Sequence, residues 1–433
     1  MPRKNDSSST VSVVHPICCG LDVHKDTISA CLIWSDTKGR EQFKVAGFQT
    51  FTDDLIKLKN WLLEHQCPVV AMESTGHYWT PIHNILEHFF TILLVNPRHM
   101  KNVPGRKTDI SDSRWIAGLL RHGLLKGGFI PPECQRQWRD LTRTRKSYVK
   151  SAGDFKRRIH KLLQSANLKI DSVISDLFGA TGRNLLKLLV TSTSTPTRVE
   201  VEACLDKSVK DKASEFYRSM EGFFSNHHRI LLRLLLETVE RLEHQIDLLD
   251  ERIREVMAEH ESVIEKLDAM PGINAISAHA ILSEIGTSLE AFPNPAALAA
   301  WAGLCPGNNQ SAGKRHSGRS RVRKNHLKEI MIEVAWPAIK KRHSYYRAKY
   351  YALKSRLGWK KAIVAVAHRI LTAVYHVVKY GVSFKDLGEA YLLNLNRKSK
   401  LRYLRKQASL LGFELTPLTC TNNSASAPIL IQS

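Results

Sequence analysis

The hydrophobic pattern of the first part of the chain alternates between short apolar runs and longer amphipathic stretches. Runs that predict β-strands recur five times, at residues 17–23, 27–34, 41–48, 69–72 and 91–95. Stretches with apolar residues at helical spacing predict three helices, at residues 51–65, 79–90 and 109–122. The polar His24-Lys25-Asp26 between the first two runs predicts a hairpin. The predicted element order is therefore β-β-β-α-β-α-β-α.

The remainder of the chain is predicted to be almost entirely helical. Residues 133–163 form a basic helical stretch, and residues 295–411 form a second basic, helical region. Residues 416–433 are rich in Ser, Thr, Asn and Ala, which predicts disorder. The fold class is therefore α/β followed by all-α. The element order of the N-terminal part matches the ribonuclease H-like arrangement.

A heptad pattern is sustained over residues 232–267. Its a positions are Leu232, Val239, Ile246, Ile253, His260 and Leu267. Only His260 interrupts this apolar seam. β-Branched residues at a positions, with Leu at most d positions, favour a two-stranded coiled coil and hence a homodimer. A helical hairpin within one chain needs the same stripe, so that alternative stays open.

Four acidic residues occupy positions from which their carboxylates can meet. Asp22 and Glu73 end the first and fourth predicted strands. Asp109 and Asp112 share one face of a predicted helix, because residues three apart are neighbours there. Hard oxygen ligands at a sheet edge are typical of Mg²⁺ sites. The pattern predicts a centre for two Mg²⁺ ions, with Mn²⁺ as a substitute, although each carboxylate alone would be interpreted as solvated.

The chain is strongly basic, with 64 Lys and Arg against 41 Asp and Glu and a formal net charge of +23. Such an imbalance is expected of a protein that binds the phosphate backbone of nucleic acid. In residues 133–163 Asp140 and Asp154 are almost the only acids, which favours phosphate contact over a solvated helix face. The cations assigned to nucleic acid in this stretch are Arg143, Arg145, Lys146, Arg157 and Arg158.

A second cationic run follows a loop rich in Gly and Asn within residues 301–324. Small residues there allow the backbone to approach a ligand closely. The cations assigned to nucleic acid are Lys314, Arg315, Arg319, Arg321, Arg323 and Lys324, with Lys107 beside the acidic pair. Ser311 and Ser317 lie where a hydroxyl could face a phosphate. By residue type alone, incidental serines in a basic loop are favoured, because no activating base is evident. Cys305 is a weaker nucleophile candidate, better explained by packing.

The segment Pro271-Gly272 lies between two helical runs. It resembles the turn of a helix-hairpin-helix, whose amides hold a phosphate without reading sequence. A plain turn between helices fits nearly as well.

Other protein classes fit the sequence less well. The apolar segment 362–378 carries His368, Arg369 and His376, so it predicts a core helix rather than a membrane span. The polar N-terminus lacks the apolar core of a secretory signal, which favours a cytoplasmic protein. The eight cysteines show no C-x-x-C spacing, so reduced structural thiols are expected.

Five motifs occur in order between residues 17 and 336. They are Gly20-Leu-Asp-Val-His-Lys, Met72-Glu-Ser-Thr-Gly, Lys107-Thr-Asp-Ile-Ser-Asp, Met270-Pro-Gly-Ile and Gly303-Leu-Cys-Pro-Gly-Asn-Asn-Gln-Ser-Ala-Gly-Lys. Together they resemble the DEDD-type insertion-sequence transposases, the group that includes the Piv and MooV site-specific invertases. The resemblance implies a RuvC-like domain at 14–130, a basic helical segment with a coiled coil at 131–267, a transposase domain at 268–411 and a tail at 412–433. It also implies a metal centre held by Asp22, Glu73, Asp109 and Asp112, with Ser311 as the nucleophile that attacks DNA.

The resemblance implies an enzyme that excises and inserts its own mobile element, in the prokaryotic cytoplasm and on the nucleoid. A structured non-coding RNA would pair with donor and target DNA, and a dimer of dimers would assemble on the DNA. Two departures from the family pattern are Ser113, where Ala is common, and Lys324, where Gly is common before Asn325. Two rivals stay open: a metal-dependent nuclease or Holliday-junction resolvase with a structural Ser311, and a non-enzymatic nucleic-acid-binding protein.

Overall fold

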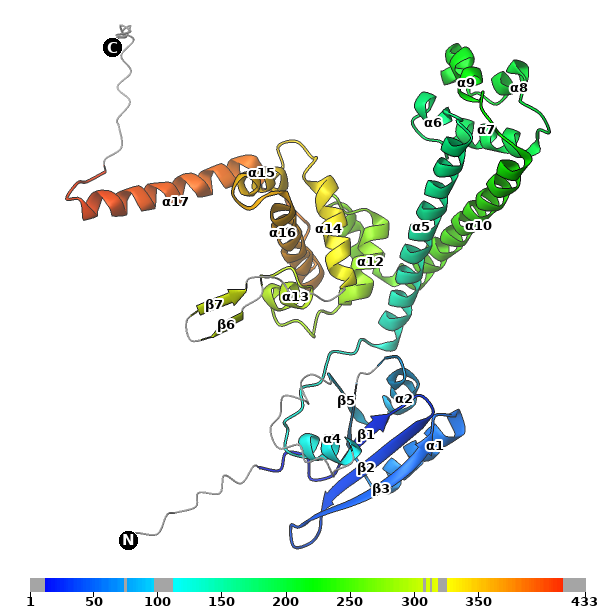
Figure 1. The fold of residues 1–433 in the computed structure, drawn as a ribbon. Coiled ribbons are helices and arrows are strands. Elements are labelled where there is room, and N and C mark those ends of the chain that lie inside the picture. Colours follow the sequence, from blue (N-terminus) through cyan, green and yellow to red (C-terminus); the bar gives the residue numbers. More distant parts are fainter. Residues whose placement is uncertain are drawn as a thin grey trace. The chain divides into compact units, whose positions relative to one another are not determined.

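The computed structural model describes residues 12–73, 76–96, 112–306, 309–311, 314–317 and 325–415. The chain divides into two compact units, residues 1–131 and residues 132–433, which are each described in turn (Figure 1).

The first unit is built on a mixed five-stranded sheet. Its strands are β1 (Cys18–Val23), β2 (Thr27–Ser35), β3 (Glu41–Gln49), β4 (Val69–Glu73) and β5 (Thr91–Val95). They lie in the order β3-β2-β1-β4-β5, with β1 antiparallel to β2 and parallel to β4. The described helices of this unit are α1 (Thr52–Glu64), α2 (Trp79–Leu86) and α4 (Asp112–Arg121). The predicted order of elements is therefore found.

Apolar side chains cover both faces of this sheet. On one face Leu21 and Met72 pack with residues of α1 and α2. On the other face Cys31 and Ala71 pack with residues of α4. Successive side chains of a strand point to opposite faces, so burial on both sides explains why β1 and β4 are nearly continuous apolar runs. This arrangement fits the ribonuclease H-like domain that was predicted.

The second unit is largely helical, as predicted, and contains one short β-hairpin. Its first helices are α5 (Glu133–Ser165), α6 (Ile170–Val173), α7 (Ala180–Thr191), α8 (Arg198–Ala203), α9 (Ala213–Ser219) and α10 (Asn226–Val256), with a 3-10 helix η1 (Lys207–Lys212) before α9. The helices that follow are η2 (Ala258–His260), α11 (Glu261–Asp268), α12 (Ala275–Ile285), α13 (Pro295–Trp301), α14 (His326–Ala338), α15 (Tyr345–Leu357), α16 (Trp359–Tyr380) and α17 (Gly388–Leu410). The hairpin, between α13 and α14, consists of β6 (Asn309–Ser311) and β7 (Lys314–Ser317).

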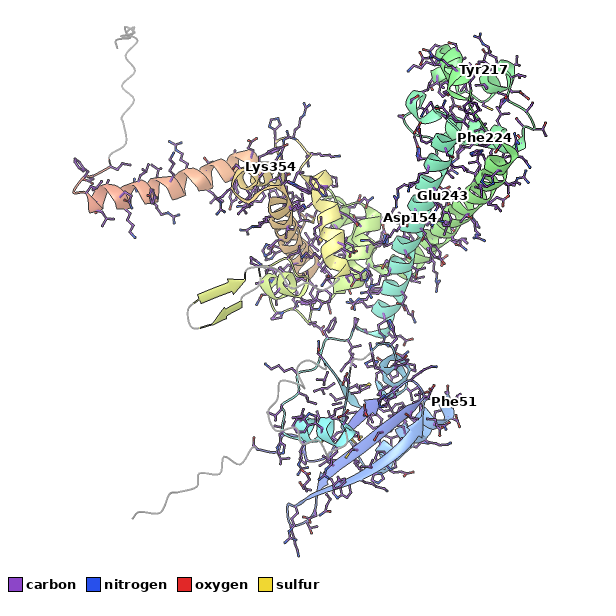
Figure 2. All side chains as sticks on the ribbon, in the orientation of Figure 1. Phe51, Asp154, Tyr217, Phe224, Glu243 and Lys354 are labelled. Carbon is purple, nitrogen blue, oxygen red and sulfur yellow. The ribbon has the colours of Figure 1, made fainter. Side chains whose placement is uncertain are left out.

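The two longest helices, α5 and α10, pack along each other within the chain (Figure 2, where Asp154 marks α5 and Glu243 marks α10). Arg145 of α5 binds Asp250 of α10. Lys156 lies further along α5, and its partner Glu243 lies earlier in α10. The two helices therefore run antiparallel and form a helical hairpin.

The heptad stripe is used inside this hairpin. Three of its a positions, Leu232, Val239 and Ile253, are buried in the helical cores of the same chain. The heptad register predicted over residues 232–267 does not lie on one helix, because α10 ends at Val256 and η2 separates it from α11. The intramolecular alternative accounts for the stripe, so the stripe by itself does not indicate a second chain.

The hairpin of α5 and α10 joins two hydrophobic cores. The distal core contains Ile159 and Leu163 of α5, packed with residues of α7, α9 and the first half of α10. The C-terminal core contains Trp138 of α5 and Ile253 of α10, packed with residues of α11 to α16. Residues of the predicted segments 131–267 and 268–411 thus share the C-terminal core.

Helix α16 is the centre of the C-terminal core. It is the one described helix that is long and apolar enough to cross a membrane. Its residues Ala362, Val366 and Ile370 are fully buried among the other helices of that core. The prediction that this segment is a core helix is therefore confirmed.

The Pro271-Gly272 turn joins α11 to α12, as predicted, and it is packed tightly. Gly272 has φ +86°, and a Cβ atom there would lie 2.3 Å from the backbone oxygen of Val334 in α14. Asn274 then caps α12, because its Oδ1 accepts a hydrogen bond of 3.0 Å from the Ser277 amide. Close packing against α14 is thus sufficient to explain the glycine.

Candidate metal centre and nucleic-acid interface

The first two predicted ligands lie side by side at one end of the sheet. In the parallel pair of β1 and β4, Leu21 is opposite Met72, and Asp22 and Glu73 are the next residue of each strand. Both strands therefore present a carboxylate near their carboxyl ends, the edge at which open α/β sheets usually bind ligands. Both side chains are half-buried.

The N-terminus of α4 covers this same edge. A Cβ atom on Gly20 would lie 2.3 Å from the backbone oxygen of Ser113 and 2.4 Å from the nitrogen of Ala117. Only glycine permits so close an approach of helix to strand. Since residues two apart on a strand share a face, Asp22 points to the side of the sheet that α4 covers.

A hydroxyl pair links α4 to the position opposite Asp22. Ser29 of β2 is the register partner of Asp22. Its Oγ lies 3.0 Å from the Oγ of Ser113, the residue that follows Asp112. Asp112, the first residue of α4, is thus held next to the strand ends that carry Asp22 and Glu73. The departure at Ser113 from the family pattern provides this contact.

Three predicted ligands therefore come from neighbouring elements: Asp22 from β1, Glu73 from β4 and Asp112 from the first turn of α4. Carboxylate oxygens beside serine hydroxyls form the hard donor set that Mg²⁺ prefers, so the residues present fit this ion. Among the described residues, the ligand atoms of Asp22, Glu73 and Asp112 are not all within 4.8 Å of one another. The fourth predicted ligand, Asp109, and the neighbouring Lys107 lie outside the described residues.

A depression opens beside Asp22. Its volume is about 650 Å³, and its lining includes His24, Ser29, Gln49 and Asp54. The imidazole of His24 lies 3.3 Å from the Asp22 carboxylate and is well exposed. Open space and an imidazole thus lie next to the Asp22 carboxylate.

The predicted nucleophile Ser311 ends β6 of the second unit. It is opposite Lys314 in the β6–β7 ladder, whereas Ser317 is opposite Asn309 at the other end. The two serines therefore occupy opposite ends of the hairpin. Side chains in this hairpin lie outside the description, as do Arg319, Arg321, Arg323 and Lys324.

Cys305, just before this hairpin, is a poor nucleophile. Its side chain packs against the C-terminal core. Burial raises the pKa of its thiol, which lowers the fraction of reactive thiolate at neutral pH. The prediction that Cys305 packs is confirmed.

The cations of α5 have carboxylate partners on other helices. Arg143 binds Glu284 of α12, Arg145 binds Asp250 of α10, and Lys146 lies 3.3 Å from Glu329 and 3.0 Å from Glu333 of α14. The prediction that these cations lack compensating carboxylates is wrong, because acids distant in the sequence supply them. Their assignment to nucleic acid therefore loses its main support.

The next two predicted cations are placed differently. Arg157 binds Asp154 one turn earlier in α5, and both side chains are exposed. The guanidinium of Arg158 lies over the ring of Phe155, 4.9 Å from its centre. Exposed pairs of this kind are weak, so both arginines can still exchange their partners for a phosphate.

Glu284 forms a buried ion-pair cluster that the sequence analysis missed. Its carboxylate accepts two hydrogen bonds from Arg143, of 2.8 and 2.9 Å, and lies 3.6 Å from the guanidinium of Arg139. Burial lowers the pKa of Arg139 to about 10, and Glu284 acts against that shift. The signal for this cluster is one acid inside the apolar run Ile281-Leu-Ser-Glu-Ile, which implies a buried partner.

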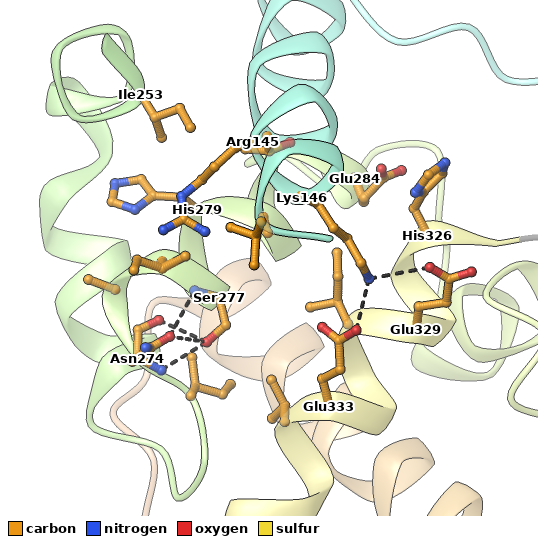
Figure 3. Close-up of a pocket in the computed structure, with 18 of the residues that line it drawn as sticks. Arg145, Lys146, Ile253, Asn274, Ser277, His279, Glu284, His326, Glu329 and Glu333 are labelled. Atoms are coloured by element: carbon orange, nitrogen blue, oxygen red, sulfur yellow. Dashed lines mark hydrogen bonds and ion pairs between the residues drawn. The ribbon is translucent and has the colours of Figure 1, made fainter. Parts of the chain in front are cut away.

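A cavity of about 1160 Å³ lies between α5, α10, α12 and α14 (Figure 3). Figure 3 shows Lys146 reaching between Glu329 and Glu333. His279 of α12 also lines the cavity; its Nε2 is buried without a hydrogen-bond partner in the described structure. Burial lowers the pKa of His279, which favours the neutral imidazole. Most charges that line this cavity are thus neutralised within the chain.

Two models of protein families match parts of the chain. Residues 19–168 match the family model of IS110-type DEDD transposases, described as "Transposase", and residues 264–352 match the model described as "Transposase IS116/IS110/IS902 family". No curated protein matches the chain significantly. The first match contains Asp22, Glu73 and Asp112, and the second contains Ser311. The chain therefore carries both domains of an IS110-family transposase, an enzyme that acts on DNA.

Proposed function

We propose that this transposase excises and inserts its mobile element through a two-Mg²⁺ centre held by Asp22, Glu73, Asp109 and Asp112. The proposal is supported by the parallel pairing that sets Asp22 beside Glu73 and by the packing of the first turn of α4, which carries Asp112, against β1. When bound, Mg²⁺ polarises the scissile phosphate, and Mn²⁺ can substitute for it. The carboxylates of this chain hold and orient the ions.

The proposed nucleophile is Ser311. Its Oγ forms a bond to the scissile phosphorus while one bond from phosphorus to a deoxyribose oxygen breaks. The serine loses its proton, and the departing oxygen gains one. The number of phosphorus–oxygen bonds is unchanged, so strands can be exchanged without ATP. Lys314 is the register partner of Ser311 in the hairpin ladder, and we propose it as the cation that stabilises the charge developing on the phosphate.

Replacement of the serine separates this mechanism from its alternatives. Ser311→Ala is expected to abolish the covalent protein–DNA adduct and to lower strand exchange by about a thousandfold or more, because the nucleophile is missing. Ser317→Ala is the matched control and should still form the adduct. Trapped adducts, digested and analysed by mass spectrometry, identify the modified residue. A nucleotide on Ser317, or a normal adduct with Ser311→Ala, would refute the assignment.

The main rival is a metal-dependent nuclease or junction resolvase that uses the carboxylates alone. It predicts that Ser311→Ala still cuts DNA at the wild-type rate, whereas the serine mechanism predicts no cut. A non-enzymatic nucleic-acid-binding protein would show no Mg²⁺-dependent change in DNA with either variant. The same gel assay of cleavage therefore separates all three functions.

We further propose that a structured RNA encoded beside the gene pairs with donor and target DNA, in the prokaryotic cytoplasm. The family resemblance supports this guidance, and the net charge of +23 is compatible with extensive backbone contacts. The nucleotide sequence that flanks the gene tests it. Two RNA loops that match the element junction and its target would support guidance, and the absence of such loops would contradict it.

A homodimer, and a dimer of dimers on DNA, belong to the same proposal. The heptad stripe does not support them, since its a positions Leu232, Val239 and Ile253 are buried within the chain. We expect the purified protein to have at least twice its chain mass of 49.0 kDa in light scattering. A concentration-independent monomer mass, both alone and with substrate DNA, would contradict the assembly.

A further inference from the structure

Four aromatic rings form a continuous cluster at the meeting point of α14, α15 and α16. They are Trp336, Tyr350, Tyr351 and Trp359, called here the aromatic patch. The ring centre of Trp336 lies 6.1 Å from that of Trp359 and 6.3 Å from that of Tyr350. The rings of Tyr350 and Tyr351 are 5.3 Å apart. Three helices thus contribute to one row of rings.

Most of this row faces solvent. Tyr350 is only 5% exposed and anchors the patch to the core, but Trp336, Trp359 and Tyr351 are 37%, 51% and 52% exposed. A single exposed aromatic residue is ordinary, whereas a contiguous group of large rings marks a surface that binds something. The patch therefore needs a partner with flat, apolar faces.

Cations border the patch. The ammonium of Lys360 lies 5.2 Å from the ring centre of Trp359. Arg347 and Lys354 lie 5.3 and 5.9 Å from the ring centre of Tyr351 (Figure 2, where Lys354 is labelled). Residues 345–380 contain eight Lys and Arg and no Asp or Glu. The partner must therefore also be strongly anionic.

We propose that the aromatic patch binds single-stranded nucleic acid, with bases stacked on the exposed rings and phosphates on the flanking cations. Every base offers a π-face to an aromatic side chain, and the backbone supplies one negative charge per nucleotide. A duplex hides its base faces and would use only the cations. A second copy of this chain fits less well, because two equally basic surfaces repel each other.

Binding at the patch extends the proposed function, and it depends on that function only because the expected partner is nucleic acid. Trp359 and α16 lie outside both family matches, which end at residues 168 and 352. Binding at the patch requires neither the carboxylates nor Ser311. If the patch variants bind oligonucleotides normally, the proposed mechanism is not affected. If Ser311→Ala still forms the adduct, the proposal for the patch is not affected.

The test is the affinity of the full-length chain for unstructured oligonucleotides, measured in EDTA. Oligothymidylate and oligouridylate distinguish DNA from RNA. Trp359→Ala and Trp336→Leu are each expected to weaken binding roughly 5- to 100-fold. The slope of log affinity against log salt should not change, because no charge is lost. Lys354→Ala should instead lower that slope by about 0.7.

Two controls make the result specific. Phe223→Ala removes another highly exposed ring, 83% exposed, from the α9–α10 connection and should leave affinity unchanged. Inorganic polyphosphate carries charge without bases, so the tryptophan variants should bind it like the wild type. Circular dichroism checks that each variant is folded. Unchanged oligonucleotide affinity in folded Trp359→Ala and Trp336→Leu would overturn the proposal. A lower mass of these variants than of the wild type in light scattering without nucleic acid would also overturn it, because the patch would then be a contact between copies of the chain.

Discussion

Asp22→Asn is expected to lower the rate of strand exchange about a thousandfold or more while the protein stays folded. The substitution keeps the size of the side chain but removes the negative charge that a divalent ion requires. A metal centre supplies several kcal/mol of transition-state stabilisation, and each 1.36 kcal/mol corresponds to about a tenfold change in rate. Asp22 is half-buried, beside Glu73 of β4 on one side and Ser29 of β2 on the other.

The measurement combines Mg²⁺ titration by calorimetry with an excision assay on plasmid DNA. Asp26→Asn is the matched control, because this exposed acid lies in the turn that follows β1 and belongs to no ligand set. It should bind Mg²⁺ and recombine DNA like the wild type. Wild-type metal affinity and activity in Asp22→Asn would eliminate the proposed centre.

The second large effect is expected on stability, from Glu284→Ala. Glu284 is 3% exposed at its side chain and lies against Arg139 and Arg143, which are 13% and 39% exposed. Its removal leaves two neighbouring guanidinium groups without their carboxylate in a partly dry site. Breaking such a buried pair costs about 3–5 kcal/mol. The second unit should therefore unfold at a markedly lower urea concentration.

Urea unfolding followed by helical circular dichroism measures this effect, since most helices belong to the second unit. Glu329→Ala is the control, because Lys146 keeps a second carboxylate, Glu333 at 3.0 Å, so a loss of at most about 1 kcal/mol is expected. If both variants unfold at the same urea concentration, the Glu284 cluster contributes no more than a surface pair. The ion pairs of Glu284 with Arg139 and Arg143 would then not be a major source of stability.

Periodicity was sufficient to predict the N-terminal unit. A strand buried on both faces produces a continuous apolar run, and each run ends where the chain reaches solvent. Asp22 and Glu73 could therefore be placed at strand ends from local pattern alone. Their closeness in space follows from the parallel pairing of β1 and β4, which the element order implied.

Charge pairing across the helical unit could not be predicted in the same way. The carboxylates that bind Arg143 and Arg145 lie more than 100 residues later in the chain, so a reading along α5 finds none. The heptad stripe was ambiguous for a related reason. An apolar seam shows that a helix needs a partner, but it does not show whether that partner is α5 or another chain.

The long hairpin has a mechanical consequence. α5 has 33 residues, which corresponds to a rod of about 50 Å at 1.5 Å per residue. One end is embedded in the distal core, the other in the C-terminal core, and α10 braces its length. For a straight rod of this length, a tilt of about one degree at one end displaces the other end by about 0.9 Å. A ligand that tilts α5 at the distal core is thus expected to move the C-terminal helices, including α13 and α14, which flank the β6–β7 hairpin.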